Sequence, residues 1–302
     1  MRLRDEMPRE QGIRHLPKKL IGHLALPLTL SVIACAISFA DDSSIPIAST
    51  AKLRAAPEVL GQTAKLGDGT EIEIGSPPLQ TDDPGTTDPN HFEINFVSTG
   101  TFSRGYKATD NVIDSNYGVN RTIQIKMETH FDSLTTSEQG TEFGTSNVFL
   151  GLKWRFLDQD RVHFQLATFP SVELPGSPES IQEGIADPGT TFFLPLLASV
   201  QFKSIRVISN IGERFGEGQS SAFYGGVAAA TPVSENATLM AEIHEDDFKT
   251  AGNSWTSVNL GAKVKLNRSG DQSLLITVGK SIHQPPGESE RRVILVGMQW
   301  LR

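Results

Sequence analysis

The sequence predicts an all-β protein, an up-and-down antiparallel transmembrane β-barrel of about twelve strands. From residue 91 onward, apolar side chains recur at every second position in one run after another, which places them on one face of extended strands. Most runs are close to the roughly nine to eleven residues that a tilted strand needs to cross a hydrocarbon layer. The connections alternate between longer and shorter, which is typical of a barrel with external loops and short periplasmic turns.

The expected strands follow one another with little intervening sequence. They cover residues 91–102, 111–119, 122–131, 145–156, 162–174, 190–202, 205–212, 221–232, 238–246, 254–266, 273–282 and 291–302. The longer connections are expected at 103–110, 132–144, 175–189, 213–220, 247–253 and 283–290, and the shorter ones at 120–121, 157–161, 203–204, 233–237 and 267–272. A sandwich with crossover connections would not sort its loops in this way.

The run 122–131 shows the two faces of a strand most clearly. Ile125 and Met127 alternate with Gln124, Lys126 and Glu128. In a barrel the apolar set contacts lipid and the polar set lines the lumen. We therefore expect Lys126→Leu to leave folding nearly intact while changing the passage of charged solutes, and Ile125→Lys to impair assembly. The runs 190–202 and 221–232 are weaker evidence for membrane strands, since the first is apolar on both faces and the second contains many small residues.

The N-terminal region carries an export signal. The long apolar run Leu20–Phe39 follows Arg14, Lys18 and Lys19 and precedes a small-x-small site at 38–40. This pattern predicts a secretory signal peptide over residues 1–40, cleaved near Ala40. Cleavage changes the formal net charge from -8 to -11, and such an acidic chain is not expected to bind nucleic acid.

The sequence contains a single cysteine, Cys35, inside this segment. After cleavage the exported chain would therefore have no thiol and no disulfide. Val32–Cys35 is similar to a bacterial lipobox, so an N-terminus lipidated at Cys35 is an alternative. Residues 41–80 are rich in Ser, Pro and Ala and end near Pro77 and Pro78, which predicts a flexible periplasmic extension. Residues 81–302 are then the barrel domain.

A short motif leads into the first strand. Thr81, Asp82, Asp83, Pro84 and Gly85 form a turn that is followed by Phe-Glu-Ile-Asn at 92–95. This stretch resembles the opening of outer-membrane transporters in the family named after the meta-pathway of phenol degradation. The resemblance implies a bacterial outer-membrane barrel that passes small hydrophobic or aromatic compounds, without cofactor or energy coupling. Expected partners are outer-membrane lipid, lipopolysaccharide and small hydrophobic solutes.

The last predicted strand, 291–302, also resembles a known signal. Its alternating apolar residues end at Trp300, and such a C-terminal strand is what the barrel-assembly machinery recognises in outer-membrane barrels. That signal normally ends on an aromatic residue, whereas this chain ends on Arg302.

Polar residues on the expected inner faces form the candidate functional set. The charges are of both signs, so part of the set should form cross-strand ion pairs. The candidates are Glu93, Gln124, Lys126, Glu128, His130, Lys153, Arg155, His163, Gln165, Arg206, Asn210, Glu242 and Lys263.

Motifs for catalysis are missing from the sequence. The histidines of the exported chain fall on separate strands or loops without metal-ligand spacing, so no metal site is expected. There is no nucleophile elbow, phosphate loop or dinucleotide fingerprint, and no cofactor is expected. The best hydrolytic combination, Ser221 with Tyr224 and His244, is weak, so the sequence does not predict an enzyme.

The leading functional hypothesis, which the family resemblance implies, is a channel for passive passage of small hydrophobic or aromatic compounds. Twelve strands enclose more than a side-chain-filled barrel of eight and less than a porin of sixteen. One alternative is an exported soluble or lipidated β-sandwich or lipocalin-like binding protein. A second is a structural barrel with a plugged lumen.

Overall fold

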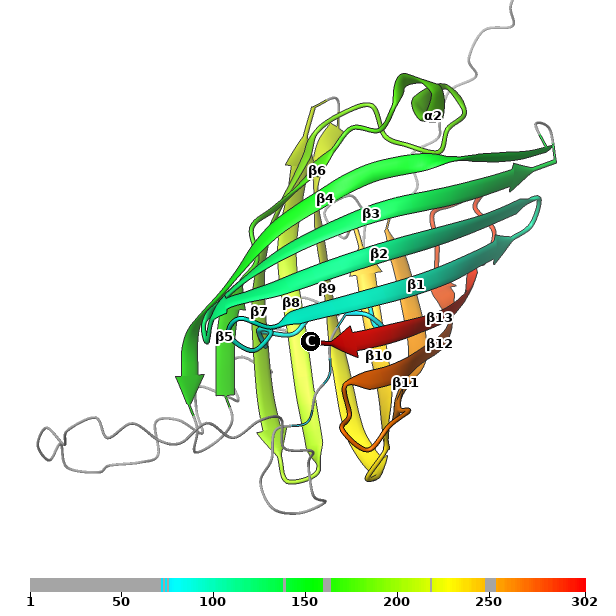
Figure 1. Cartoon of the computed structure of the whole chain (residues 1–302). Helices are drawn as coiled ribbons and strands as arrows, with labels where there is room; N and C mark the ends of the chain where they lie inside the picture. Colours follow the sequence, from blue (N-terminus) through cyan, green and yellow to red (C-terminus); the bar gives the residue numbers. More distant parts are fainter. Residues whose placement is uncertain are drawn as a thin grey trace, which may run out of the picture.

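The structure, a computed structural model, describes residues 72, 74, 76–137, 140–159, 164–217, 219–247 and 254–302. The expected signal peptide and lipobox, and most of the expected extension, lie outside these residues. The described chain forms a ring of antiparallel strands in which the first strand pairs with the last, so the sheet is closed (Figure 1).

The ring contains thirteen strand segments in chain order. These are β1 (Phe92–Ser103), β2 (Tyr106–Asn120), β3 (Ile123–Thr136), β4 (Gly140–Gln159), β5 (Phe164–Thr168), β6 (Ser171–Leu174), β7 (Thr191–Phe202), β8 (Ile205–Gly216), β9 (Gln219–Ser234), β10 (Ala237–Asp246), β11 (Trp255–Lys265), β12 (Gln272–His283) and β13 (Arg292–Leu301). A short helix, α2 (Pro178–Gln182), lies between β6 and β7.

The segments β5 and β6 share one position in the ring, because both pair with β4 on one side and with β7 on the other. The break falls at Phe169 and Pro170, and proline has no amide hydrogen for the sheet ladder. The predicted single strand 162–174 is thus interrupted, with its first residues outside the described chain. The predicted closed antiparallel barrel of twelve strands is confirmed.

The end of the barrel at which β1 begins and β13 ends is called the terminal end, and the opposite end is called the far end. Three of the predicted long connections at the far end are wrong. β1 and β2 are joined by Arg104 and Gly105 alone, with Gly105 at φ 74°, and the connections after β3 and β8 shrink to 137–139 and 217–218. The strands run further than their apolar alternation because backbone pairing continues beyond the apolar band, as at Asp110 opposite Asp132. The connections 175–190, 247–254 and 284–291 are long, as predicted.

The two faces of the sheet differ in chemistry. Large apolar side chains such as Ile125, Trp154 and Val296 are about half exposed on the outer face. Inner-face residues such as Asp114 and Lys126 are polar and buried. An outer apolar band around a polar interior is the arrangement of a barrel in lipid, whereas two packed sheets would bury an apolar layer between them. The alternative of a soluble β-sandwich or lipocalin-like protein is therefore wrong.

Helical structure has little part in this fold. Within the described residues, no helix combines the length and apolar character that crossing a membrane requires.

Replacing Ile125 by Lys tests the outer face. The substitution would place an ammonium group against lipid, at a cost of roughly 2–4 kcal/mol near the bilayer midplane. We expect a reduced fraction of folded barrel, measured by heat-modifiable gel migration, whereas the apolar control Ile125→Val should assemble normally. Equal yields of folded barrel from both variants would contradict this assignment of the outer face.

Candidate functional site

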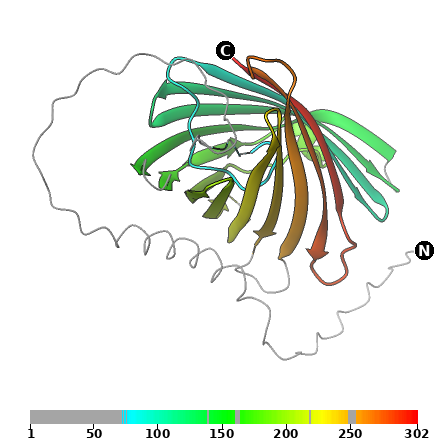
Figure 2. The same cartoon turned by 90° about the horizontal axis from the view of Figure 1, so that it is seen from below.

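The segment that precedes β1 lies inside the barrel. The described residues 72, 74 and 76–87, called here the inner segment, cross the interior of the ring (Figure 2). Ile72, Ile74 and Leu79 are buried against inner-face residues of β8, β9 and β10, including Ile208 and Met240. The structure thus places residues 72, 74 and 76–80 in the lumen, although the sequence led us to expect an extension up to residue 80. An extension upstream of residue 72 remains a prediction.

Glu242 on β10 is the first anchor of the inner segment. Its carboxylate accepts hydrogen bonds from the backbone amides of Gln80 at 2.9 Å and Thr81 at 2.8 Å. It also accepts one from Asn259 Nδ2 of β11 at 2.7 Å. Hydrogen bonds to a buried charged acceptor are among the stronger ones in proteins, so this contact fixes the inner segment at mid-barrel.

Lys153 on β4 is the second anchor. Its ammonium donates to Asp82 Oδ1 at 3.0 Å and to the carbonyl oxygen of Asp83 at 2.9 Å. The Asp83 carboxylate accepts from the Gly85 amide, a local bond that forms the turn. The side chains of the Thr-Asp-Asp-Pro-Gly motif therefore shape the inner segment and attach it to the barrel wall.

Gly226 on β9 leaves space for the side chain of Thr81. A Cβ atom at position 226 would collide with the Thr81 hydroxyl oxygen and would also approach the ring of His244. Thr81 is fully buried, so the absence of a side chain at Gly226 allows the inner segment to lie against the wall.

Gly226→Ala should therefore loosen the inner segment. The added methyl group occupies the place of the Thr81 hydroxyl, and we expect a higher single-channel conductance in planar bilayers. Ala229→Val, which adds bulk to the exposed outer face of the same strand, is the matched control and should conduct like the wild type. Wild-type conductance from a well-folded Gly226→Ala barrel would contradict this role of Gly226.

A charged wall covers the inner faces of β1, β2 and β3. Lys126 Nζ lies 2.7 Å from Glu128 Oε1 and 3.5 Å from Asp114 Oδ2. Asn95 donates to both Asp114 and Glu93, at 3.0 and 2.9 Å. Lys126 is thus paired with Glu128 on its own strand and with Asp114 on the neighbouring strand, because charges in a low-dielectric interior need partners.

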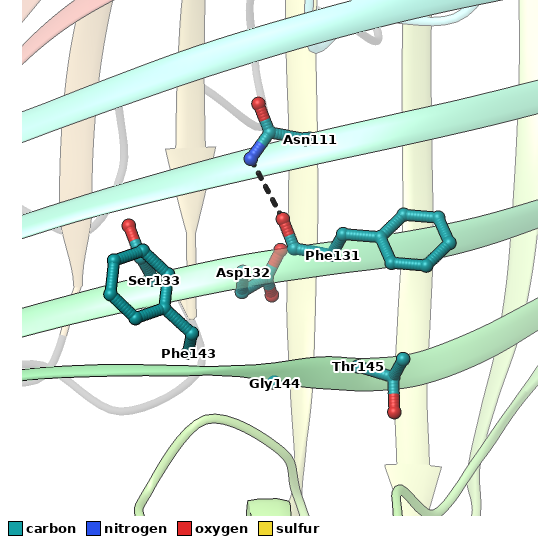
Figure 3. Close-up of a pocket in the computed structure, with 7 residues that line it drawn as sticks. All are labelled: Asn111, Phe131, Asp132, Ser133, Phe143, Gly144 and Thr145. Atoms are coloured by element: carbon teal, nitrogen blue, oxygen red, sulfur yellow. Dashed lines mark hydrogen bonds between the residues drawn. The ribbon is translucent and has the colours of Figure 1, made fainter.

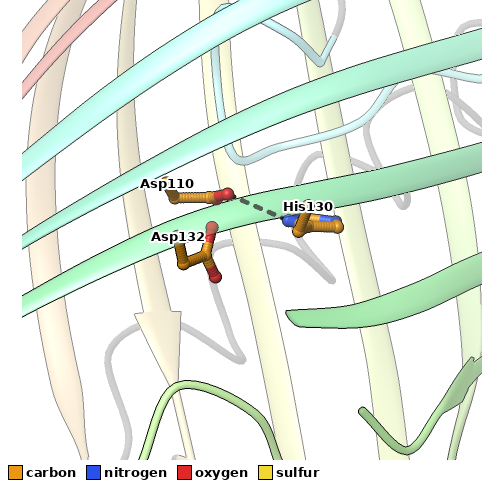
Figure 4. A group of neighbouring side chains, drawn as sticks. All are labelled: Asp110, His130 and Asp132. Carbon is orange, nitrogen blue, oxygen red and sulfur yellow. Dashed lines mark hydrogen bonds and ion pairs between the residues drawn. The ribbon is translucent and has the colours of Figure 1, made fainter. Parts of the chain in front are cut away.

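A second charged group lies further along the same strands (Figure 4). The ligand-type atoms of Asp110, His130 and Asp132 lie within 4.8 Å of one another. His130 Nδ1 is 3.0 Å from Asp110 and its Nε2 is 3.4 Å from Glu128. One imidazole and two carboxylates can hold a divalent cation. Sequence spacing did not reveal this group, because only the cross-strand pairing of Asp110 with Asp132 brings it together.

An aromatic wall covers the inner faces of β4 to β9. The Phe149 ring centroid lies 6.0 Å from that of Phe169 and 5.9 Å from that of Phe193, and Phe193 lies 6.1 Å from Tyr224. Ala167 and Leu197 are buried in the same cluster. This wall explains why the run 190–202 is apolar on both faces. It also explains why the apolar residue Phe149 stands on the polar face of the run 145–156.

The remaining candidates are distributed over the barrel. Arg206 donates to Gln165 Oε1 at 2.9 Å and to the carbonyl oxygen of Ile72 at 3.2 Å. Gln124 accepts from the amide of Thr87 at 2.7 Å. Arg155 donates to the carbonyl oxygen of Arg121 and lies 3.4 Å from Asp158.

Two other candidates also lie on the ring: Asn210 is buried on β8, and Lys263 is partly buried on β11. His163 lies outside the described residues. The hydrolytic combination of Ser221, Tyr224 and His244 does not form, because Ser221 and Tyr224 are three residues apart on one strand and so point to opposite faces.

One open cavity of the described residues has none of the four rings of the aromatic wall in its lining. It has a volume of about 410 Å³ and is lined by residues of β2, β3 and β4, among them Asn111, Phe131 and Phe143 (Figure 3). Phe131 and Phe143 are exposed large apolar side chains. Since its lining consists mainly of outer-face residues, we do not assign this cavity to the lumen.

Comparison with known proteins supports the fold. No known protein-family model matches this sequence, and no curated protein matches it. An outer membrane channel from Pseudomonas putida F1 superimposes with a TM-score of 0.56, covering 77% of this chain and 100% of that one at 12% identity. The NanC porin gives a TM-score of 0.49 at 9% identity, covering 68% of this chain and 98% of that one. The CymD monoaromatic hydrocarbon channel gives 0.39 at 7% identity, covering 72% and 89%.

The closed ring, the outer apolar band and the first of these likenesses define the class of protein. The chain has the fold of an outer-membrane β-barrel. At 12% identity the likeness extends to the fold alone. Membership in the meta-pathway family remains a prediction from the sequence.

Proposed function

We propose that this protein is a passive outer-membrane channel for small hydrophobic or aromatic compounds, working without cofactor or energy coupling. The aromatic wall is the observation that supports this proposal. Phe149, Phe169, Phe193 and Tyr224 lie on the inner face of a sheet whose other inner positions are largely polar. Rings in offset or edge-to-face contact offer an aromatic ligand a favourable surface.

We also propose an orientation and surroundings for the barrel. The terminal end faces the periplasm and the far end faces outward, as in barrels with short periplasmic turns. The exported chain begins after Ala40, is inserted by the barrel-assembly machinery, and contacts outer-membrane lipid and lipopolysaccharide through its apolar band.

A second candidate function is a structural barrel with a plugged lumen. The inner segment favours it, because the backbone around residue 80 is bonded to Glu242 and Lys153 across the lumen. The two candidates differ in one measurable respect, since a structural barrel neither conducts nor supports uptake.

Uptake of a labelled monoaromatic solute by cells lacking the chromosomal copy tests the proposal. The double substitution of Phe149→Ser and Phe193→Ser should lower uptake by about 2- to 12-fold for each ring removed, the factor that corresponds to the 0.5–1.5 kcal/mol of an aromatic contact. Phe192→Ser, which removes a ring from the outer face, is the matched control. Equal uptake by cells with and without the barrel would favour the structural candidate.

A further inference from the structure

The connection between β6 and β7, residues 175–190 and called here the strap, is folded against the wall of the barrel. Its two ends are joined, because Gly176 donates a backbone hydrogen bond to Asp187 at 3.4 Å. Ser177 caps α2, and the amides of Ile185 and Ala186 both bond to the carbonyl oxygen of Ser180. The strap is therefore a compact unit with its own hydrogen bonds.

Asn147 on β4 attaches this unit to the inner face of the barrel. Its Nδ2 donates to the carbonyl oxygens of Leu174 at 2.9 Å and Asp187 at 3.3 Å. Its Oδ1 accepts from the Asp187 amide at 2.9 Å. The side chain is 5% exposed and thus ties both ends of the strap to one point. Ser146 adds a bond to the carbonyl oxygen of Ile185 at 3.0 Å.

A bulge in the sheet makes this attachment possible. The pairing of β3 with β4 shifts register between Thr129 and Phe131, so that Ser146 and Asn147 together oppose His130. A bulge bends a strand and re-aims its side chains. The pairing of β6 with β4 ends at Val148, and the strap continues along the part of β4 beyond it. There Ser180 and Ile185 pack against Gly144.

The strap lies next to the aromatic wall. Phe149 is two residues from Asn147 and is the register partner of Glu173 on β6. Phe193 follows the strap by three residues on β7. Figure 1 shows α2 at the far end of the barrel, beyond β4 and β6. A solute that enters from the far end therefore passes the strap before it reaches the rings.

We propose that the strap limits the size of solutes that reach the aromatic wall, and that Asn147 is the residue that holds it closed. The claim that the strap selects solutes by size rests on the proposed channel function. The claim that Asn147 holds the strap closed does not. When Asn147 is lost, two donors and one acceptor of the hydrogen-bonded attachment are lost together, and the strap opens more often.

Thiol labelling in intact cells measures this opening. In a Glu173→Cys parent the thiol lies on the inner face of β6, two residues before the strap begins, and its reaction with a bulky polyethylene-glycol maleimide added outside reports access past the strap. Adding Asn147→Ala should raise the labelling rate by a factor of about 5 to 30, the range that corresponds to a net loss of roughly 1–2 kcal/mol in the stability of the attachment. Asn111→Ala, the same change on the outer face of β2, should leave the rate unchanged.

A disulfide between the strap and β4 tests whether the increase in labelling can be reversed. A Cβ atom at position 144 would lie 3.5 Å from Ser180 Cβ, within the usual range of about 3.5–4.5 Å for disulfides. Oxidised Gly144→Cys with Ser180→Cys should return the Asn147→Ala rate to that of the parent or below it, and reduction should raise it again. An unchanged rate in Asn147→Ala, or an increase that the disulfide does not reverse, would overturn the proposal.

The disulfide also tests the proposal if the Asn147→Ala variant fails to assemble. In the parent alone the disulfide should form readily, because the closed strap holds positions 144 and 180 in contact. Failure of the disulfide to form in a folded parent barrel would mean that the strap is normally open, and would refute the proposal. A barrel that transports solutes without any preference for aromatic ones would refute the proposed function. It would not affect the conclusion drawn from thiol labelling about the closed strap.

Discussion

Replacing Lys153 by Met together with Glu242 by Gln should release the inner segment and raise single-channel conductance several-fold. Both anchors act through hydrogen bonds to a charged group, each of which contributes about 1.5–3 kcal/mol. The change at Lys153 would also leave Asp82 without its ammonium partner at 3.0 Å. With the segment displaced, the lumen of a twelve-stranded ring is wide enough to conduct. Recordings in planar bilayers measure the effect.

An exposed ion pair provides the matched control for this double variant. Lys280 and Glu290 lie 3.9 Å apart near the far end, and such surface pairs contribute little to stability. Lys280→Met with Glu290→Gln should conduct like the wild type. Wild-type conductance from a folded Lys153→Met and Glu242→Gln barrel would show that these contacts do not hold the inner segment in place.

Lys126→Leu should destabilise the barrel by about 3–5 kcal/mol, the usual cost of removing one partner from a buried ion pair. It leaves Asp114, which is 1% exposed, and Glu128 without their cation. From the sequence alone we expected this substitution to leave folding nearly intact. The structure reverses that expectation, because the lumen around Lys126 is filled by its partners and not by bulk water. Denaturant unfolding of the reconstituted barrel measures the loss.

Neutralising the two carboxylates should restore most of that stability. Lys126→Leu combined with Asp114→Asn and Glu128→Gln removes the uncompensated charges while keeping similar shapes. Lys280→Leu, at an exposed lysine, should change the free energy of unfolding by about 1 kcal/mol or less. A stable Lys126→Leu single variant would mean that this part of the lumen is well hydrated.

The sequence was sufficient to predict the barrel, because the outer faces alternate so regularly. Strands such as 122–131 reveal their faces through Ile125 and Lys126, and the pattern recurs around the ring. The loop lengths at the far end were less predictable. Residues such as Thr109 and Asp110 look like loop residues, yet they continue the ladder above the apolar band.

The interior was harder to predict from the sequence, since its contacts join residues far apart in the chain. Lys153 was recognisable as a lumen residue, but nothing near it in sequence indicates Asp82 as its partner. Likewise, Phe149 is an apolar residue on the polar face of the run 145–156, and only the structure brings Phe169 and Phe193 beside it. The strap was expected as a loop, whereas its attachment to Asn147 depends on a bulge that alternation does not reveal.

Osmotic swelling of proteoliposomes that contain the purified full-length barrel tests the channel function most directly. The rates for a small phenolic solute and for a hexose are each compared with those of protein-free vesicles. The aromatic wall predicts that the barrel adds more to the phenolic rate than to the hexose rate, and that Phe149→Ser with Phe193→Ser removes most of this difference. Entry of the hexose without any increase in phenolic entry would contradict the proposed function.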